Sequence, residues 1–103
     1  MPEYNKLVRD RIPEIIEASG RRCEVRELND EEYLAALNRK LGEELQEYLA
    51  DGSLGELADL VEVVNAIVLF RGHSLEEFEQ IRMEKQQVRG GFTRRVLLVS
   101  TVD

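Results

Sequence analysis

Two short acidic motifs with the spacing of metal-binding sites lie within residues 40–65. Their carboxylates are Glu43, Glu44 and Glu47 in an E-E-x-x-E motif, followed by Glu56 and Asp59 in an E-x-x-D motif. Residues three or four positions apart share one face of a helix, so each motif is expected to direct carboxylates the same way. Only residues 51–55 separate the two helical patterns, and a connection this short makes two helices antiparallel neighbours. The two sets of carboxylates are therefore expected to converge.

Converging carboxylates are unfavourable without a cation. Glu43 and Glu47 repel each other as like charges four positions apart, and residues 57–70 are otherwise apolar nearly all round, which is typical of a buried helix. Buried carboxylates must be paired, protonated or bound to metal, and no Lys or Arg lies between Leu41 and Phe70. Carboxylate oxygens suit Mg²⁺ or Mn²⁺, so the sequence predicts such a site. The alternative is a solvated acidic face on two ordinary helices.

Basic residues outside this stretch could complete the site by binding phosphate oxygens, bidentately from Arg and as a point charge from Lys. They are Lys6 and Arg9 near the N-terminus, Lys40 one turn before the first motif, and Arg82, Lys85 and Arg89 toward the C-terminus. The last three are spaced by three and four residues, so they share one helix face. The alternative for these residues is a solvated basic face that balances nearby glutamates.

The elements that must position these groups are mainly helical. The spacing of apolar residues predicts helices at about 10–18, 30–50, 54–71 and 75–88. Asn29 or Asp30 is expected to cap the second of these helices, with Glu32 in the capping-box position after Asn29, and Ser74 with Glu77 has the spacing of a second capping box. Residues 22–28 and 92–102 have strand-like patterns, and we expect them to pair, because a lone strand cannot satisfy its backbone. The predicted fold is one domain over residues 1–103, with four helices and a small two-stranded β ribbon.

Composition narrows the class of partner. The chain has 103 residues, 43% of them apolar, and a net charge of −7. Residues 41–70 contain acids and no Lys or Arg, and they account for all of the excess charge. This charge argues against a nucleic-acid duplex or an anionic membrane as the main partner. No secretory signal pattern and no apolar run near the ~18 residues of a membrane span occurs, so the expected location is cytoplasmic.

Beyond these physical patterns, the chain resembles a known family. KLGEELQE at 40–47, followed by ELAD at 56–59, resembles the signature of the MazG-like all-α nucleoside triphosphate pyrophosphohydrolase superfamily. That superfamily includes phosphoribosyl-ATP pyrophosphohydrolase and dimeric dUTPases. The flanks YNKLVRDRIP at 4–13 and RGGF at 89–92 resemble its phosphoribosyl-ATP pyrophosphohydrolase-like branch. The resemblance covers nearly the whole chain and implies a four-helix fold that assembles as a dimer or higher oligomer.

The resemblance also implies roles for individual residues. The Mg²⁺ ligands would be Glu44, Glu47, Glu56 and Asp59. Glu43 would be a further ligand or would hold one in place, and Lys40 would face a phosphate. Asn65 matches an asparagine often found after the second motif; because it lies 180° from Glu56 on an ideal helix, we assign it to the substrate or to support of a ligand.

Three hypotheses follow. The first is a Mg²⁺-dependent nucleotide pyrophosphohydrolase that cleaves between the α- and β-phosphates, with Glu43 or Glu44 activating a water and Lys and Arg side chains from the flanks holding phosphates. The second is a helical dimer that binds nucleotide or metal without turnover. The third is a purely structural partner protein. The base, the sugar and the order of oligomer are not specified by the sequence.

Overall fold

Four helices make up the regular structure of this protein in a computed structural model that describes residues 5–102. They are α1 (Ile12–Ala18), α2 (Asp30–Asp51), α3 (Leu54–Phe70) and α4 (Leu75–Arg89). All four predicted helices are confirmed, and their ends lie within two residues of the expected positions. In the part of the chain that the structure describes, no helix is long and apolar enough to cross a membrane.

The turn between α2 and α3 follows from its sequence. Gly52 ends α2 with φ of 70°, a left-handed conformation that glycine adopts without steric penalty. Its N–H donates to the carbonyl oxygen of Tyr48 at 2.7 Å. Ser53 then caps α3 at once, its hydroxyl accepting a hydrogen bond from the N–H of Glu56 at 3.2 Å. So short a turn leaves α2 and α3 antiparallel.

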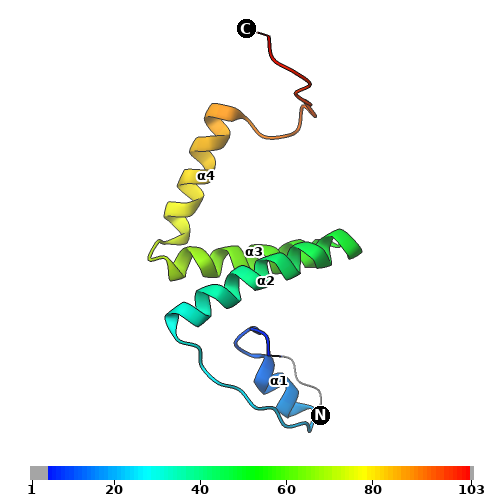
Figure 1. The fold of residues 1–103 in the computed structure, drawn as a ribbon, viewed down its shortest axis with the longest axis vertical. Helices are drawn as coiled ribbons and strands as arrows, with labels where there is room; N and C mark the ends of the chain where they lie inside the picture. Colours follow the sequence, from blue (N-terminus) through cyan, green and yellow to red (C-terminus); the bar gives the residue numbers. More distant parts are fainter. Residues whose placement is uncertain (1–4, 103) are drawn as a thin grey trace.

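The four helices do not form a closed bundle (Figure 1). Helices α2 and α3 lie side by side along most of their length, whereas α4 leaves the end of α3 at a steep angle. Helix α1 lies on the other side of this hairpin and packs against no other helix in the described range. The molecule is correspondingly elongated, with extents of 63 × 32 × 23 Å.

Apolar packing is concentrated between α2 and α3. Leu37 and Val63 are the buried apolar residues among those described, at 2% and 7% exposure. At the far end of the hairpin the rings of Tyr33 and Phe70 meet edge to face, with centroids 5.3 Å apart. The expectation that α3 is buried all round is wrong for the single chain, because α2 covers only one face and Leu69 is 55% exposed.

The predicted β ribbon is also wrong: residues 22–28 and 92–102 form no strand in the described structure. The two segments lie at opposite ends of the molecule, with the α2–α3 hairpin between them (Figure 1). Neither therefore meets the backbone partner that a strand requires. The C-terminal run is also interrupted by a turn, in which Arg95 has φ of 59° and donates to the carbonyl oxygen of Phe92 at 3.1 Å.

Candidate metal centre

Three carboxylates from the two sequence motifs meet near the α2–α3 turn. Glu44 on α2 and Glu56 and Asp59 on α3 each offer one oxygen, and these three oxygens lie within 4.8 Å of one another. All three residues are half-buried. Glu56 and Asp59 share a face because they are three positions apart, and the tight turn brings that face against Glu44. We call these three residues the acidic triad.

Glu56 reaches the triad from an unusual position at a helix start. It is the third residue of α3, after the cap residue Ser53, and this is the position from which a glutamate can close a capping box. The Ser53 half of the box is present at 3.2 Å. Among the described residues, however, the Glu56 carboxylate makes no return hydrogen bond to the Ser53 N–H. The carboxylate lies in the triad instead.

The electrostatics of the triad are those of crowded negative charge. Partial burial, followed by the charges of Asp59, Glu44, Glu47 and Asp51, raises the pKa of Glu56. Desolvation and neighbouring like charges both disfavour the ionised carboxylate. A divalent cation among these oxygens would reverse that preference. The crowded carboxylate oxygens can therefore accept a cation.

Two basic side chains from outside the acidic stretch already contact the triad. The Arg9 guanidinium donates to Asp59 Oδ1 at 2.6 Å, and Lys40 Nζ lies 3.5 Å from Glu44 Oε1. The absence of Lys and Arg between residues 41 and 70 led us to expect unpaired carboxylates. That expectation is wrong for Glu44 and Asp59, because Lys40 lies one turn before Glu44 and Arg9 reaches across from the N-terminal segment.

The structure brings together three of the four predicted metal ligands. Glu47 is exposed and lies outside the triad, although its charge contributes to the raised pKa of Glu56. Glu43 is half-buried on α2, also outside the triad. Lys6 lies exposed in the segment before α1.

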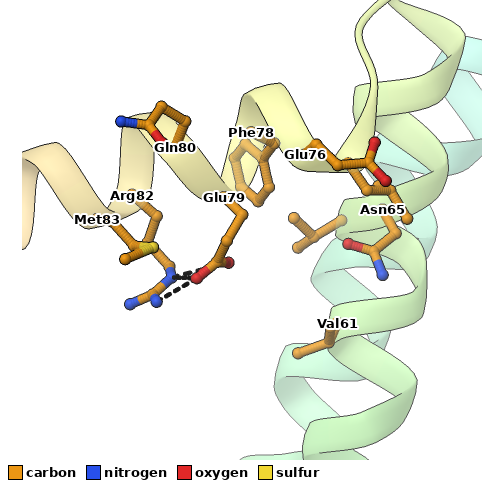
Figure 2. Close-up of a pocket in the computed structure, with 10 residues that line it drawn as sticks. Val61, Asn65, Glu76, Phe78, Glu79, Gln80, Arg82 and Met83 are labelled. Carbon is orange, nitrogen blue, oxygen red and sulfur yellow. Dashed lines mark hydrogen bonds and ion pairs between the residues drawn. The ribbon is translucent and has the colours of Figure 1, made fainter.

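The remaining predicted substrate-binding residues lie away from the triad. Asn65 is on α3 nine residues beyond Glu56, which is about 14 Å along a helix. Arg82, Lys85 and Arg89 are on α4, which starts at the opposite end of the hairpin from the α2–α3 turn (Figure 1). Asn65 and Arg82 instead line an open groove of about 710 Å³ between α3 and α4. Figure 2 shows Val61 and Asn65 facing this groove from α3, and Phe78 and Met83 from α4.

Arg82 is engaged within its own helix. Its guanidinium pairs with Glu79 one turn earlier (Figure 2), and this contact lowers the pKa of the Glu79 carboxyl.

The α3 cap Ser53, whose hydroxyl accepts from the N–H of the triad residue Glu56, was not predicted from the sequence. The signal was available, because Ser53-x-x-Glu56 has the same spacing as the boxes that we recognised at Asn29 and Ser74.

Comparisons with known proteins identify a similar sequence that has no described activity. No protein-family model matches the chain, and no solved structure matches it. An uncharacterized protein of Mycolicibacterium smegmatis (strain ATCC 700084 / mc(2)155) is 60% identical over 45 residues, which is 44% of this chain and 46% of that protein. The match thus spans a little under half the length of that relative.

Proposed function

We propose that the chain is a Mg²⁺-dependent nucleoside triphosphate pyrophosphohydrolase, which releases pyrophosphate and leaves a nucleoside monophosphate. The observation that carries this proposal is the meeting of Glu44, Glu56 and Asp59 within 4.8 Å. These residues come from the two acidic motifs, whose order along the chain resembles the MazG-like signature. The raised pKa of Glu56 supports it further, because it marks a place where negative charge accumulates without full compensation.

The donor set fits Mg²⁺ or Mn²⁺. Both ions take oxygen ligands, and all three donors are carboxylates. Glu44, Glu56 and Asp59 would hold the ion, with their oxygens, now within 4.8 Å of one another, drawn closer together around it. A bound ion would neutralise charge developing on the phosphates and lower the pKa of a coordinated water.

The protein side chains would do the remaining work. Glu43 or Glu44, on the α2 side, would orient the attacking water and take its proton. Lys40, close to Glu44 at 3.5 Å, would place a positive charge beside the phosphates, and Arg9 would supply a guanidinium suited to phosphate oxygens. Asn65 and the α4 residues Arg82, Lys85 and Arg89 would contribute only if another part of an assembly, or a long substrate, brought them to the triad.

We also propose that the chain works as a homodimer or higher oligomer. In the described residues only Leu37 and Val63 are buried apolar side chains, while Val61 and Leu69 on α3 are more than half exposed. The groove between α3 and α4 is lined largely by apolar side chains. Large exposed apolar surfaces commonly mark protein–protein contacts. Light scattering of the purified protein measures the assembly directly. The predicted cytoplasmic location remains part of this proposal.

The decisive experiment measures pyrophosphate release from a panel of ribo- and deoxyribonucleoside triphosphates and phosphoribosyl-ATP, with Mg²⁺ or Mn²⁺. We expect release from at least one member of the panel. Glu44→Gln and Asp59→Asn should reduce the rate by about a hundredfold or more, because metal-assisted charge stabilisation contributes several kcal/mol. Glu62→Gln is the matched control, since Glu62 is an exposed carboxylate of α3 outside the triad. No release from any nucleotide, or full activity in both triad variants, would end the proposal.

One observation favours the second hypothesis, a binding module without turnover. Arg9 and Lys40 already compensate Asp59 and Glu44, so the triad can exist in a folded chain without an ion. The same panel separates the two functions. Nucleotide binding that requires a divalent ion but yields no product would identify a binding module.

A further inference from the structure

The contact between Arg9 and Asp59 joins distant parts of the chain. The two residues are 50 positions apart, and Arg9 Nη2 lies 2.6 Å from Asp59 Oδ1. By contrast, Arg11 pairs with Glu14 three positions away, and Arg26 pairs with Glu32 six positions away. Helix α1 packs against no other described helix. The Arg9 contact therefore ties the segment before α1 to α3.

Arg9 binds the same carboxylate that would bind the metal ion. Asp59 belongs to the acidic triad, and its Oδ1 already accepts a charge-assisted hydrogen bond from the guanidinium. A divalent ion among the triad oxygens would lie a few ångströms from this positive charge. Because like charges at that range repel, the guanidinium and the ion compete for Asp59.

We propose that Arg9 is an internal counter-cation: it holds Asp59 while no divalent ion is bound and leaves Asp59 when an ion binds. This inference rests on the proposed metal site. Its consequence is a coupling between ion binding and the N-terminal segment. Ion binding loosens the segment of residues 5–11 at Arg9 and frees the guanidinium for an anionic group, such as a phosphate that arrives with the ion.

Two roles of Arg9 predict opposite effects of its removal on ion affinity. If Arg9 instead held Asp59 in the orientation that the ion requires, its removal would weaken ion binding. Competition requires that its removal strengthen ion binding. Arg9 is about half exposed, and exposed ion pairs contribute little free energy. We therefore expect Arg9→Gln to bind the ion about two- to fivefold more tightly than wild type.

Calorimetric titration with Mn²⁺ alone, at low ionic strength and without nucleotide, provides the first readout. We compare wild type, Arg9→Gln and Arg11→Gln. Arg11→Gln is the matched control, because it removes the same charge only two positions from Arg9. Arg11 pairs with Glu14, at 3.5 Å, and not with the triad. We expect tighter binding in Arg9→Gln and unchanged binding in Arg11→Gln. Equal or weaker binding in Arg9→Gln overturns the competition.

Limited trypsin digestion provides the second readout. Lys6 and Arg11 are cleavage sites in the segment, and Arg94 and Arg95 in the C-terminal run serve as internal controls. In wild type, Mn²⁺ should accelerate cleavage at Lys6 and Arg11 several-fold without changing cleavage at Arg94 or Arg95. In Arg9→Gln, cleavage should be fast with or without the ion. Absence of an ion effect in wild type that binds Mn²⁺ overturns the inference.

The two readouts separate this inference from the function on which it rests. If neither wild type nor Arg9→Gln binds Mn²⁺ at millimolar concentration, the proposed metal site fails and the competition fails with it. If both proteins bind Mn²⁺ with the same affinity and the segment stays equally protected, only the role of Arg9 fails. The metal site would then stand unchanged.

Discussion

Helices α2, α3 and α4 begin with the same four-residue pattern, in which a capping residue is followed three positions later by a glutamate, yet the glutamate of α3 behaves differently from the other two. At α2 and α4, the side chains of Glu32 and Glu77 turn back to accept from the N–H groups of Asn29 and Ser74, at 3.2 and 3.0 Å. At α3, Glu56 occupies the equivalent position, but its carboxylate lies with Glu44 and Asp59. One local sequence pattern thus has two structural outcomes.

The pKa shifts run in opposite directions at these helix starts. The hydrogen bond from Arg26, followed by that from the Asn29 N–H, lowers the pKa of Glu32. The Ser74 N–H, followed by His73, lowers the pKa of Glu77. Burial and the neighbouring acids raise the pKa of Glu56. The anions of Glu32 and Glu77 are thus stabilised, mainly by Arg26 and by the Ser74 N–H, whereas burial and neighbouring acids disfavour the anion of Glu56.

The largest expected difference between the helix starts is in ion affinity. Glu56→Gln should weaken Mn²⁺ binding by about a hundredfold or more, because removing even the outer partner of a ligand costs about 10–100-fold. Glu32→Gln and Glu77→Gln should leave the affinity within about twofold. Calorimetric titration of the three variants tests this. Equal losses in all three would mean that Glu56 has no special place among these glutamates.

The next difference is in thermal stabilisation by the ion. A ligand at 100 times its dissociation constant stabilises the folded state by about 2.7 kcal/mol, which for a domain of this size raises Tm by about 10 °C. Wild type and Glu77→Gln should show this rise with Mn²⁺, and Glu56→Gln should not. A rise of the same size in Glu56→Gln would place the ion elsewhere in the molecule.

The serine caps should be equivalent even though the glutamates are not. Ser53 and Ser74 each accept from the N–H three positions later, at 3.2 and 3.0 Å. Replacing either by alanine should cost about 1 kcal/mol of unfolding free energy, measured by urea denaturation in the presence of a chelator. Ser53→Ala should leave Glu56 within the triad. A much smaller cost for Ser53→Ala would show that α3 does not depend on its cap.

The smallest expected difference is in the pH dependence of stability without divalent ions. A lowered pKa in the folded state stabilises the protein at neutral pH, and this contribution is lost as pH falls through the folded pKa. Glu77→Gln should therefore lower Tm at pH 7 and have little effect at low pH. A raised folded pKa acts in the opposite sense, destabilising the folded state above that pKa. Glu56→Gln should therefore raise Tm at pH 7, with a difference that shrinks as pH falls toward the ordinary glutamate range.

These pH effects are measured as Tm between about pH 7 and pH 4, with Glu62→Gln as a control for the general loss of one negative charge. Opposite signs for the Glu77 and Glu56 variants at pH 7 would sharpen the contrast between the two kinds of helix start. Changes in Tm of the same sign in both variants would contradict this contrast.

Much of the helical structure was predictable because its determinants are local. The pattern of apolar residues predicted all four helices, and the capping boxes at Asn29 and Ser74 are confirmed. The spacing of the two acidic motifs around the Asp51–Gly55 connection predicted that their carboxylates converge, which Glu44, Glu56 and Asp59 do and Glu47 does not. Each of these inferences depends on residues within a few positions of one another, or on a turn too short to allow another arrangement.

The predictions that were wrong share another cause, because each concerned contacts between parts of the chain that are distant in the sequence. Residues 92–102 have the composition of a strand, but a strand needs a partner in space, and no described segment lies alongside them. The apolar helix α3 was expected to be covered on all sides, but among the described residues only α2 packs along its length, and α4 contacts it at one end. Arg9 and Lys40 were expected to bind phosphate, but they pair with the carboxylates of Asp59 and Glu44, because the fold brings them closer to the triad than their positions in the sequence indicate.

By itself, the sequence determined where the helices begin and end to within two residues, and that carboxylates from both motifs converge across the turn, because backbone hydrogen bonds, caps and helical periodicity act over a few residues. Only the tertiary structure decided that Glu56 leaves its capping position for the triad, and that Arg9 reaches Asp59 from 50 residues away. Those outcomes depend on the balance of charges brought together in space.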